Sequence, residues 1–163
     1  MDLTPQPKTP AAIVDASLII GFCTKEPNKY GIAKATLDEY DNDGRQLFAP
    51  SVLIGEVLHV LCRKLKDNSL DAAGHASALS SFIAIMSGIS PPPTGDASLI
   101  PLAEQFRGAL TCQRSNDAFY LALAEQLNAD RKTELATFDA GMKSQANAYA
   151  STVDVKVLPV LRS

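Results

Sequence analysis

Near its N-terminus the sequence contains the stretch AAIVDASLIIGF, residues 11–22. Its first four residues are apolar and Asp15 ends the run, which is the pattern of a short buried β-strand. Apolar residues resume at once, and a short helix is predicted over residues 17–22. The stretch therefore predicts a strand that is followed directly by a helix, with one carboxylate at the junction.

The same alternation of short strands and helices continues along the chain. Strands are predicted over residues 46–49, 134–137 and 153–157, with a strand or loop after Gly88, and helices over residues 29–40, 51–66, 70–86, 96–106, 116–127 and 140–149. Asp96 is expected to cap the helix that it begins. Strands alternating with helices predict an α/β fold with a parallel sheet covered on both faces. Ligands of such sheets bind beyond the carboxyl ends of the strands, where the strand order switches.

Length and composition indicate one globular domain. The chain has 163 residues, 46% of them apolar, and three prolines fall within residues 1–10. We expect a flexible tail over residues 1–10 and a domain over residues 11–163. No apolar segment is long enough to cross a bilayer and no signal peptide is indicated, so a cytoplasmic protein is expected. The formal net charge of −3 argues against a broad basic surface, but carboxylates gathered at a metal site would contribute to it.

Four acidic residues stand where predicted elements begin or end, or beside an apolar stripe. Asp15 and Asp139 follow strands, Asp117 lies in the first turn of a helix, and Glu56 borders the apolar stripe of another helix. Each has an ordinary explanation: an aspartate at a helix start caps free N–H groups, and Glu56 could form an ion pair with Arg63 or another basic residue. Taken together, the four can converge at the carboxyl edge of a parallel sheet.

Converging carboxylates predict a site for a divalent cation. Several of them in one pocket cannot all remain ionised unless a cation compensates their charge. Oxygen ligands with few imidazoles favour Mg²⁺ or Mn²⁺. Such ions activate water and neutralise phosphate charge, which is the chemistry of phosphodiester hydrolysis.

Four segments, in this order and spacing, resemble the PIN domain family, and most closely its VapC-type toxins. The segments are IVDAS (13–17), PSVLIGEV (50–57), SNDAFYLALA (115–124) and LATFD (135–139). The resemblance covers residues 11 to 160. It implies a three-layer sandwich with a short central parallel sheet, and a metal-dependent endoribonuclease that acts as the toxin of a toxin–antitoxin pair.

The resemblance also assigns roles to individual residues. It implies that Asp15, Glu56, Asp117 and Asp139 are the catalytic, metal-binding acids, holding Mg²⁺ or Mn²⁺, and that the small hydroxyl residues Ser17 and Thr137 support them. It further implies an RNA substrate, an antitoxin partner and a homodimer, for which the helices predicted over residues 29–40 and 51–66 offer a surface. The sequence departs from the family pattern at two positions: Ala140 stands where a basic or polar residue is expected, and Asn116 stands where many relatives have another polar residue. Neither departure removes a ligand, but both put contacts with the substrate in doubt.

Other hypotheses explain parts of the same sequence. Glu56 and His59 have the spacing of half a di-metal carboxylate site, but the second half is absent. No glycine-rich phosphate loop occurs, and Ser17 stands where an aspartyl-phosphate phosphatase needs an aspartate. Basic residues at three positions could hold RNA phosphates, namely Arg63, Lys64 and Arg114. A housekeeping RNA-processing nuclease or a catalytically silent binding module stays open as an alternative to the toxin.

Overall fold

The computed structural model describes residues 8–109, 116–149 and 151–161. The strands in these residues are β1 (Ala11–Val14), β2 (Gln46–Phe48), β3 (Ile89–Ser90), β4 (Thr133–Thr137) and β5 (Asp154–Val157). The helices are α1 (Ala16–Cys23), α2 (Tyr30–Asn42), α3 (Val52–Lys66), α4 (Ala72–Met86), the 3₁₀ helix η1 (Asp96–Leu99), α5 (Ile100–Ala109), α6 (Asp117–Asn128) and α7 (Ala140–Ala148). The predicted alternation of strands and helices is confirmed.

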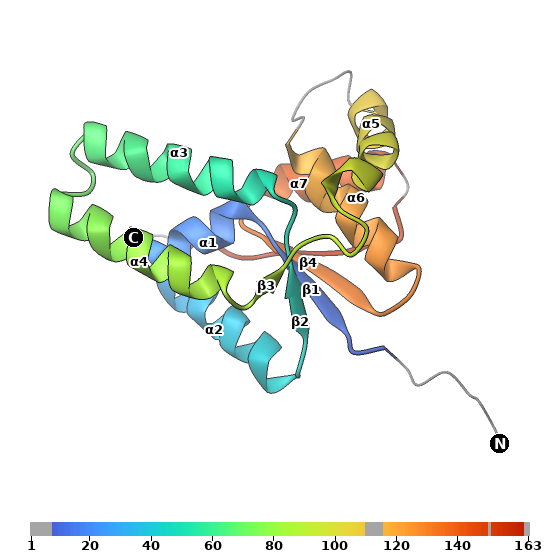
Figure 1. The fold of residues 1–163 in the computed structure, drawn as a ribbon, viewed down its shortest axis with the longest axis horizontal. Coiled ribbons are helices and arrows are strands. Elements are labelled where there is room, and N and C mark those ends of the chain that lie inside the picture. Colours follow the sequence, from blue (N-terminus) through green and yellow to red (C-terminus); the bar gives the residue numbers. More distant parts are fainter. Residues whose placement is uncertain (1–7, 110–115, 150, 162–163) are drawn as a thin grey trace.

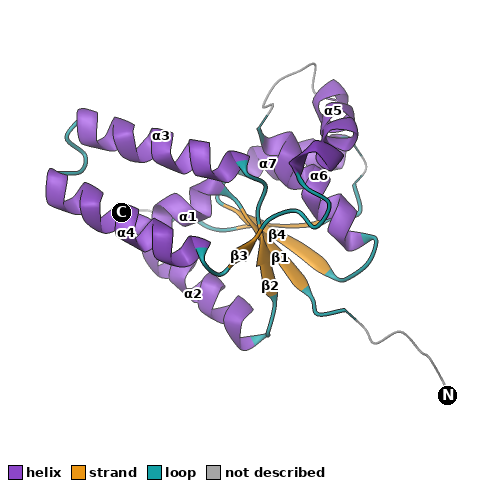
Figure 2. Ribbon diagram, in the orientation of Figure 1, coloured by secondary structure: helices purple, strands orange, loops and turns teal. Residues whose placement is uncertain are grey.

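The strands form one parallel sheet in the order β3-β2-β1-β4-β5 (Figure 2). Every side chain of the central strand β1 is buried, as expected for a parallel strand that is covered on both faces. Helices α1 to α4 pack together on one side of the sheet, and α5 to α7 pack together on the other (Figure 1). The predicted three-layer α/β sandwich is therefore confirmed.

Helix α3 shows why the sequence pattern predicts its elements well. Leu53, Val57 and Leu61 recur every fourth residue and are fully buried, so one face of the helix packs on the core. In the described part of the chain, no helix has the length and apolarity that crossing a membrane requires.

The prediction that Asp96 caps its own helix is wrong. The segment expected as one helix is divided into η1 and α5, and Gly95 occupies the capping position without a side-chain hydrogen bond. The Asp96 carboxylate instead accepts hydrogen bonds from the backbone N–H of Ser51 at 2.8 Å and from the Ser51 hydroxyl at 2.5 Å. Because η1 lies beside the start of α3, Asp96 serves that helix, whose first N–H groups need partners.

Candidate active site

The carboxyl ends of β1 and β4 lie side by side where the strand order reverses. The chain runs from β1 outward to β2 and β3, and then returns to β4 on the other side of β1. Val14 at the end of β1 is paired with Ala136 of β4, so Asp15 and Thr137, which follow them, emerge at the same edge. This switch point is where open parallel sheets bind ligands.

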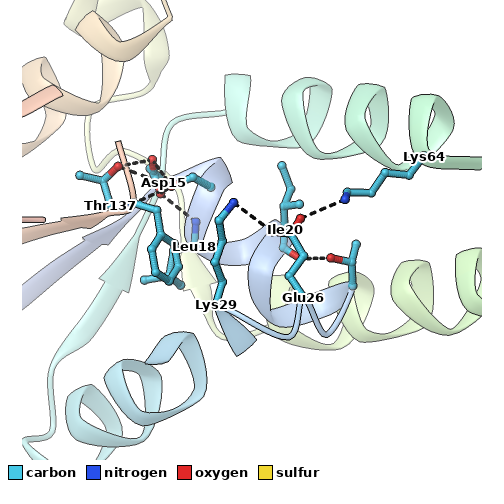
Figure 3. A network of polar contacts seen from close by, with 10 residues as sticks. Asp15, Leu18, Ile20, Glu26, Lys29, Lys64 and Thr137 are labelled. Carbon is cyan, nitrogen blue, oxygen red and sulfur yellow. Dashed lines mark hydrogen bonds and ion pairs between the residues drawn. The ribbon is translucent and has the colours of Figure 1, made fainter. Parts of the chain in front are cut away.

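Asp15 is a buried carboxylate that is surrounded by hydrogen-bond donors. Only 4% of its surface is exposed. The Ser17 hydroxyl lies 2.8 and 2.9 Å from its two oxygens, and the Thr137 hydroxyl donates to Oδ2 at 2.7 Å. The backbone N–H of Leu18 donates to Oδ1 at 3.0 Å (Figure 3), so Asp15 also caps α1. The capping explanation is correct for Asp15, but it leaves open why two further hydroxyls hold a buried carboxylate.

The surroundings of Asp15 make its ionised form less favourable than it is in water. Burial raises the pKa of Asp15 to about 6, although hydrogen bonds from Thr137, Leu18 and Ser17 lower it, and the charge of Glu56 raises it further. A buried carboxylate with a second carboxylate nearby is the environment that a cation would stabilise.

Asp139 is joined to the same group of residues through the backbone. Its N–H donates to the Thr137 hydroxyl at 2.8 Å, and the N–H of Phe138 donates to the Ser17 hydroxyl at 2.9 Å. The Asp139 carboxylate accepts a hydrogen bond from Gly141 at 2.7 Å and caps α7. Ser17 and Thr137 therefore connect the end of β1 with the turn between β4 and α7.

Glu56 approaches this edge from α3. Its half-buried carboxylate accepts a hydrogen bond from the Tyr120 hydroxyl at 2.5 Å, so the partner shown for Glu56 is a tyrosine of α6 rather than Arg63. Glu56 also lines a pocket of about 360 Å³, whose other lining residues are Ser51, Val52, Gly55, His59 and Asn116. The pocket lies between the start of α3 and the start of α6.

Asp117 is the first residue of α6 and follows the pocket residue Asn116. The structure thus places Asp15, Glu56 and Asp139 around the ends of β1 and β4, with Asp117 beside the pocket that Glu56 lines. Within the described residues, no three carboxylates, imidazoles or thiolates are close enough together to hold a metal ion as they stand.

The donor atoms at this edge nevertheless fit a hard divalent cation. Asp15 and Glu56 lie near enough for the charge of Glu56 to raise the pKa of Asp15. In the part of the chain that the structure describes, no lysine, arginine or histidine forms an ion pair with either of them. Carboxylate and hydroxyl oxygens are the donor set that Mg²⁺ and Mn²⁺ prefer.

The three basic residues considered for RNA binding differ in their placement. Lys64 forms an ion pair with Glu26 at 3.0 Å, and Lys29 binds the other oxygen of Glu26 at 2.9 Å (Figure 3). Burial raises the pKa of Glu26, but these two ammonium groups hold it below its ordinary value. Arg63 is exposed, and Arg114 lies outside the described residues.

Tyr120 is a residue of this edge that the sequence patterns did not predict. It lies within the apolar run of α6 and is 1% exposed. A tyrosine in an otherwise apolar helix is a usable signal, because a buried phenol needs a hydrogen-bond acceptor. The identity of that acceptor depends on the packing of α6 near α3.

Comparisons with known proteins agree with this architecture. The model of the PIN domain family matches residues 12–148, and no curated protein matches the sequence. The crystal structure of PAE2754 from Pyrobaculum aerophilum is similar over 90% of this chain and 83% of its own, with a TM-score of 0.54 and 15% identity. A chain in the structure of FitAB bound to an IR36 DNA fragment is similar over 90% of this chain and 94% of its own, with a TM-score of 0.55 and 21% identity. At these identities the two structures show a shared fold alone.

Proposed function

Because the chain belongs to the PIN domain family, we propose that it is a metal-dependent endoribonuclease that hydrolyses RNA phosphodiester bonds. The observation that carries the proposal is the buried Asp15 carboxylate at the switch point, with Glu56 near enough to raise its pKa. A capping aspartate needs only the N–H groups of its helix and gains nothing from burial beside another carboxylate. A bound cation would account for both the burial of Asp15 and the presence of Glu56 beside it.

We assign Asp15, Glu56, Asp117 and Asp139 as the residues that would hold Mg²⁺ or Mn²⁺. A bound divalent ion supplies a water of lowered pKa and neutralises charge on the scissile phosphate. The hydroxyls of Ser17 and Thr137 orient the Asp15 carboxylate through the hydrogen bonds described above. Asp15 and Asp139 also cap α1 and α7 through the backbone N–H groups of Leu18 and Gly141, which fixes where each carboxylate lies.

The test of this proposal is cleavage of RNA by the purified protein. Cleavage is expected with Mg²⁺ or Mn²⁺ and should stop when EDTA removes the ion. Cleavage that continues undiminished in EDTA would contradict a metal-dependent mechanism, and stable RNA under all conditions would favour the catalytically silent module.

Arg63, Lys64 and Arg114 are proposed as phosphate contacts for the RNA. Arg63 is exposed on α3 and available to solvent. Lys64 would exchange its partner Glu26 for a phosphate, and Lys29 would still compensate the charge of Glu26.

We also propose that the protein is the toxin of a toxin–antitoxin pair, with a cognate antitoxin and a homodimeric state, and that it acts in the cytoplasm. The family resemblance of the four motifs is the main support. The fold that the chain shares with FitAB, which was solved as a complex bound to DNA, agrees with a protein that works with partners. Ile54, Leu58 and Leu65 are exposed on one face of α3, and such a face suits a contact between two copies of the chain.

The toxin hypothesis makes a prediction about how well cells that express the protein grow. Expression of the wild type in a bacterial host should arrest growth, and expression of Glu56→Gln at a matched protein level should not, because the variant lacks one charged ligand. The measurement is the growth curve of each of the two strains. Unhindered growth of both strains, alongside RNA cleavage by the purified wild type, would favour a housekeeping RNA-processing enzyme.

A further inference from the structure

Tyr120 connects two elements of the candidate active site. It lies on α6, its side chain is 1% exposed, and its hydroxyl donates to Glu56 Oε2 at 2.5 Å. Glu56 lies on α3, 64 residues earlier in the chain. A glutamate has three rotatable side-chain bonds, so a single short hydrogen bond from a rigid, buried donor strongly restricts where its carboxylate can lie.

The phenol oxygen also faces the start of α1. The negative charge of Asp15 acts on the phenol, and so does the backbone N–H of Ala16, the residue after Asp15. The Tyr120 hydroxyl therefore lies between the turn that carries Asp15 and the carboxylate of Glu56.

We propose that Tyr120 is a positioning residue, which holds the Glu56 carboxylate toward Asp15 in the geometry that a divalent cation needs. The inference rests on the proposed metal-dependent function and adds a residue outside the set of acids. The hydrogen bond engages Oε2 and not Oε1, so the carboxylate is held through one oxygen. Without the hydroxyl, Glu56 would be free to turn into the pocket of about 360 Å³ that it lines.

The chain offers a matched control in Tyr40. Tyr40 is 0% exposed, and its hydroxyl also donates to a glutamate, Glu134 Oε1, at 2.5 Å. Glu134 precedes Thr137 by three residues in β4, which places it about 10 Å from the carboxyl edge of the sheet. Tyr40→Phe and Tyr120→Phe therefore remove the same group from the same kind of contact, one away from the site and one at it.

The experiment measures Mn²⁺ affinity by calorimetry for the wild type, Tyr120→Phe and Tyr40→Phe, with thermal melts in EDTA to compare their stabilities. Residues that orient metal ligands typically contribute 10- to 100-fold to affinity, so Tyr120→Phe should weaken Mn²⁺ binding by about that factor. Tyr40→Phe should bind Mn²⁺ as the wild type does, even where its melting temperature falls as far as that of Tyr120→Phe.

A double variant tests whether Tyr120 acts through Glu56. In the Glu56→Gln background, adding Tyr120→Phe should cause little further loss of Mn²⁺ affinity, because the group that it positions is already altered. Equal affinities of the wild type and Tyr120→Phe, or the same loss in both backgrounds, would overturn the role of Tyr120 and leave the proposed function in place. A wild-type protein that binds no Mn²⁺ would overturn both.

Discussion

Replacing Asp15 with asparagine is expected to lower the rate of RNA cleavage by about 10³-fold or more, since a metal ion contributes several kcal/mol to a phosphoryl-transfer barrier and each 1.36 kcal/mol is a factor of ten. Asparagine keeps the size of the side chain, and its carbonyl oxygen can still accept the hydrogen bond from the Leu18 N–H that caps α1. The fold should therefore be retained while one charged ligand is lost. The measurement is cleavage of a labelled RNA by variant and wild type in Mg²⁺ or Mn²⁺.

Asp71→Asn is the control that separates catalysis from capping. Asp71 caps α4 by accepting a hydrogen bond from the Gly74 N–H at 2.7 Å, at an exposed helix start. It resembles Asp15 in its capping role and differs in being exposed rather than buried. Cleavage by Asp71→Asn should match the wild type. Cleavage by Asp15→Asn at the same rate as Asp71→Asn would leave capping as the sufficient account of Asp15.

The second large effect is the pH dependence of stability in the metal-free protein. Burial raises the pKa of Asp15 from 3.8 to about 6 in the folded state, so the folded protein holds this proton more tightly than the unfolded chain does. The contribution of the protonated Asp15 to the free energy of unfolding is therefore fully present below about pH 4. It falls as the pH rises through about 4 to 6, and stays low above that range. A shift of about 2 pKa units corresponds to about 3 kcal/mol.

Urea titrations of the wild type and Asp15→Asn in EDTA, from about pH 4 to pH 8, measure this contribution as the difference between their free energies of unfolding. Taking the difference cancels the contributions of other titrating groups. One of these is Glu26, whose lowered pKa stabilises the fold at higher pH and so acts in the opposite direction. As the pH rises, the free energy of unfolding of Asp15→Asn should increase relative to that of the wild type. Mn²⁺ at about ten times its Kd should then return about 1.4 kcal/mol to the wild type at neutral pH, and much less to the variant. A difference that does not change with pH would contradict a buried, uncompensated Asp15.

The elements of this protein could be predicted because their signals are local. The all-apolar β1, the buried stripe of α3 and the aspartates at the starts of α1 and α7 depend on residues within a turn or two of one another. Hydrophobic period and helix capping act over that distance. The same local character explains the failure at Asp96, whose pattern is that of a helix cap but whose carboxylate serves Ser51, 45 residues away.

The order of the strands and the choice of partners depend on contacts that no local pattern encodes. Four acids at the boundaries of elements are visible in the sequence, but only the placement of β4 beside β1 brings Thr137 to within 2.7 Å of Asp15, 122 residues away. Arg63, seven residues from Glu56, is a plausible partner by sequence, yet the packed structure pairs Glu56 with Tyr120 and Lys64 with Glu26. The physical reason is that a hydrogen bond requires two groups within about 3 Å and an ion pair within about 4 Å. Distances between residues far apart in the chain are set by how the sheet and helices pack together.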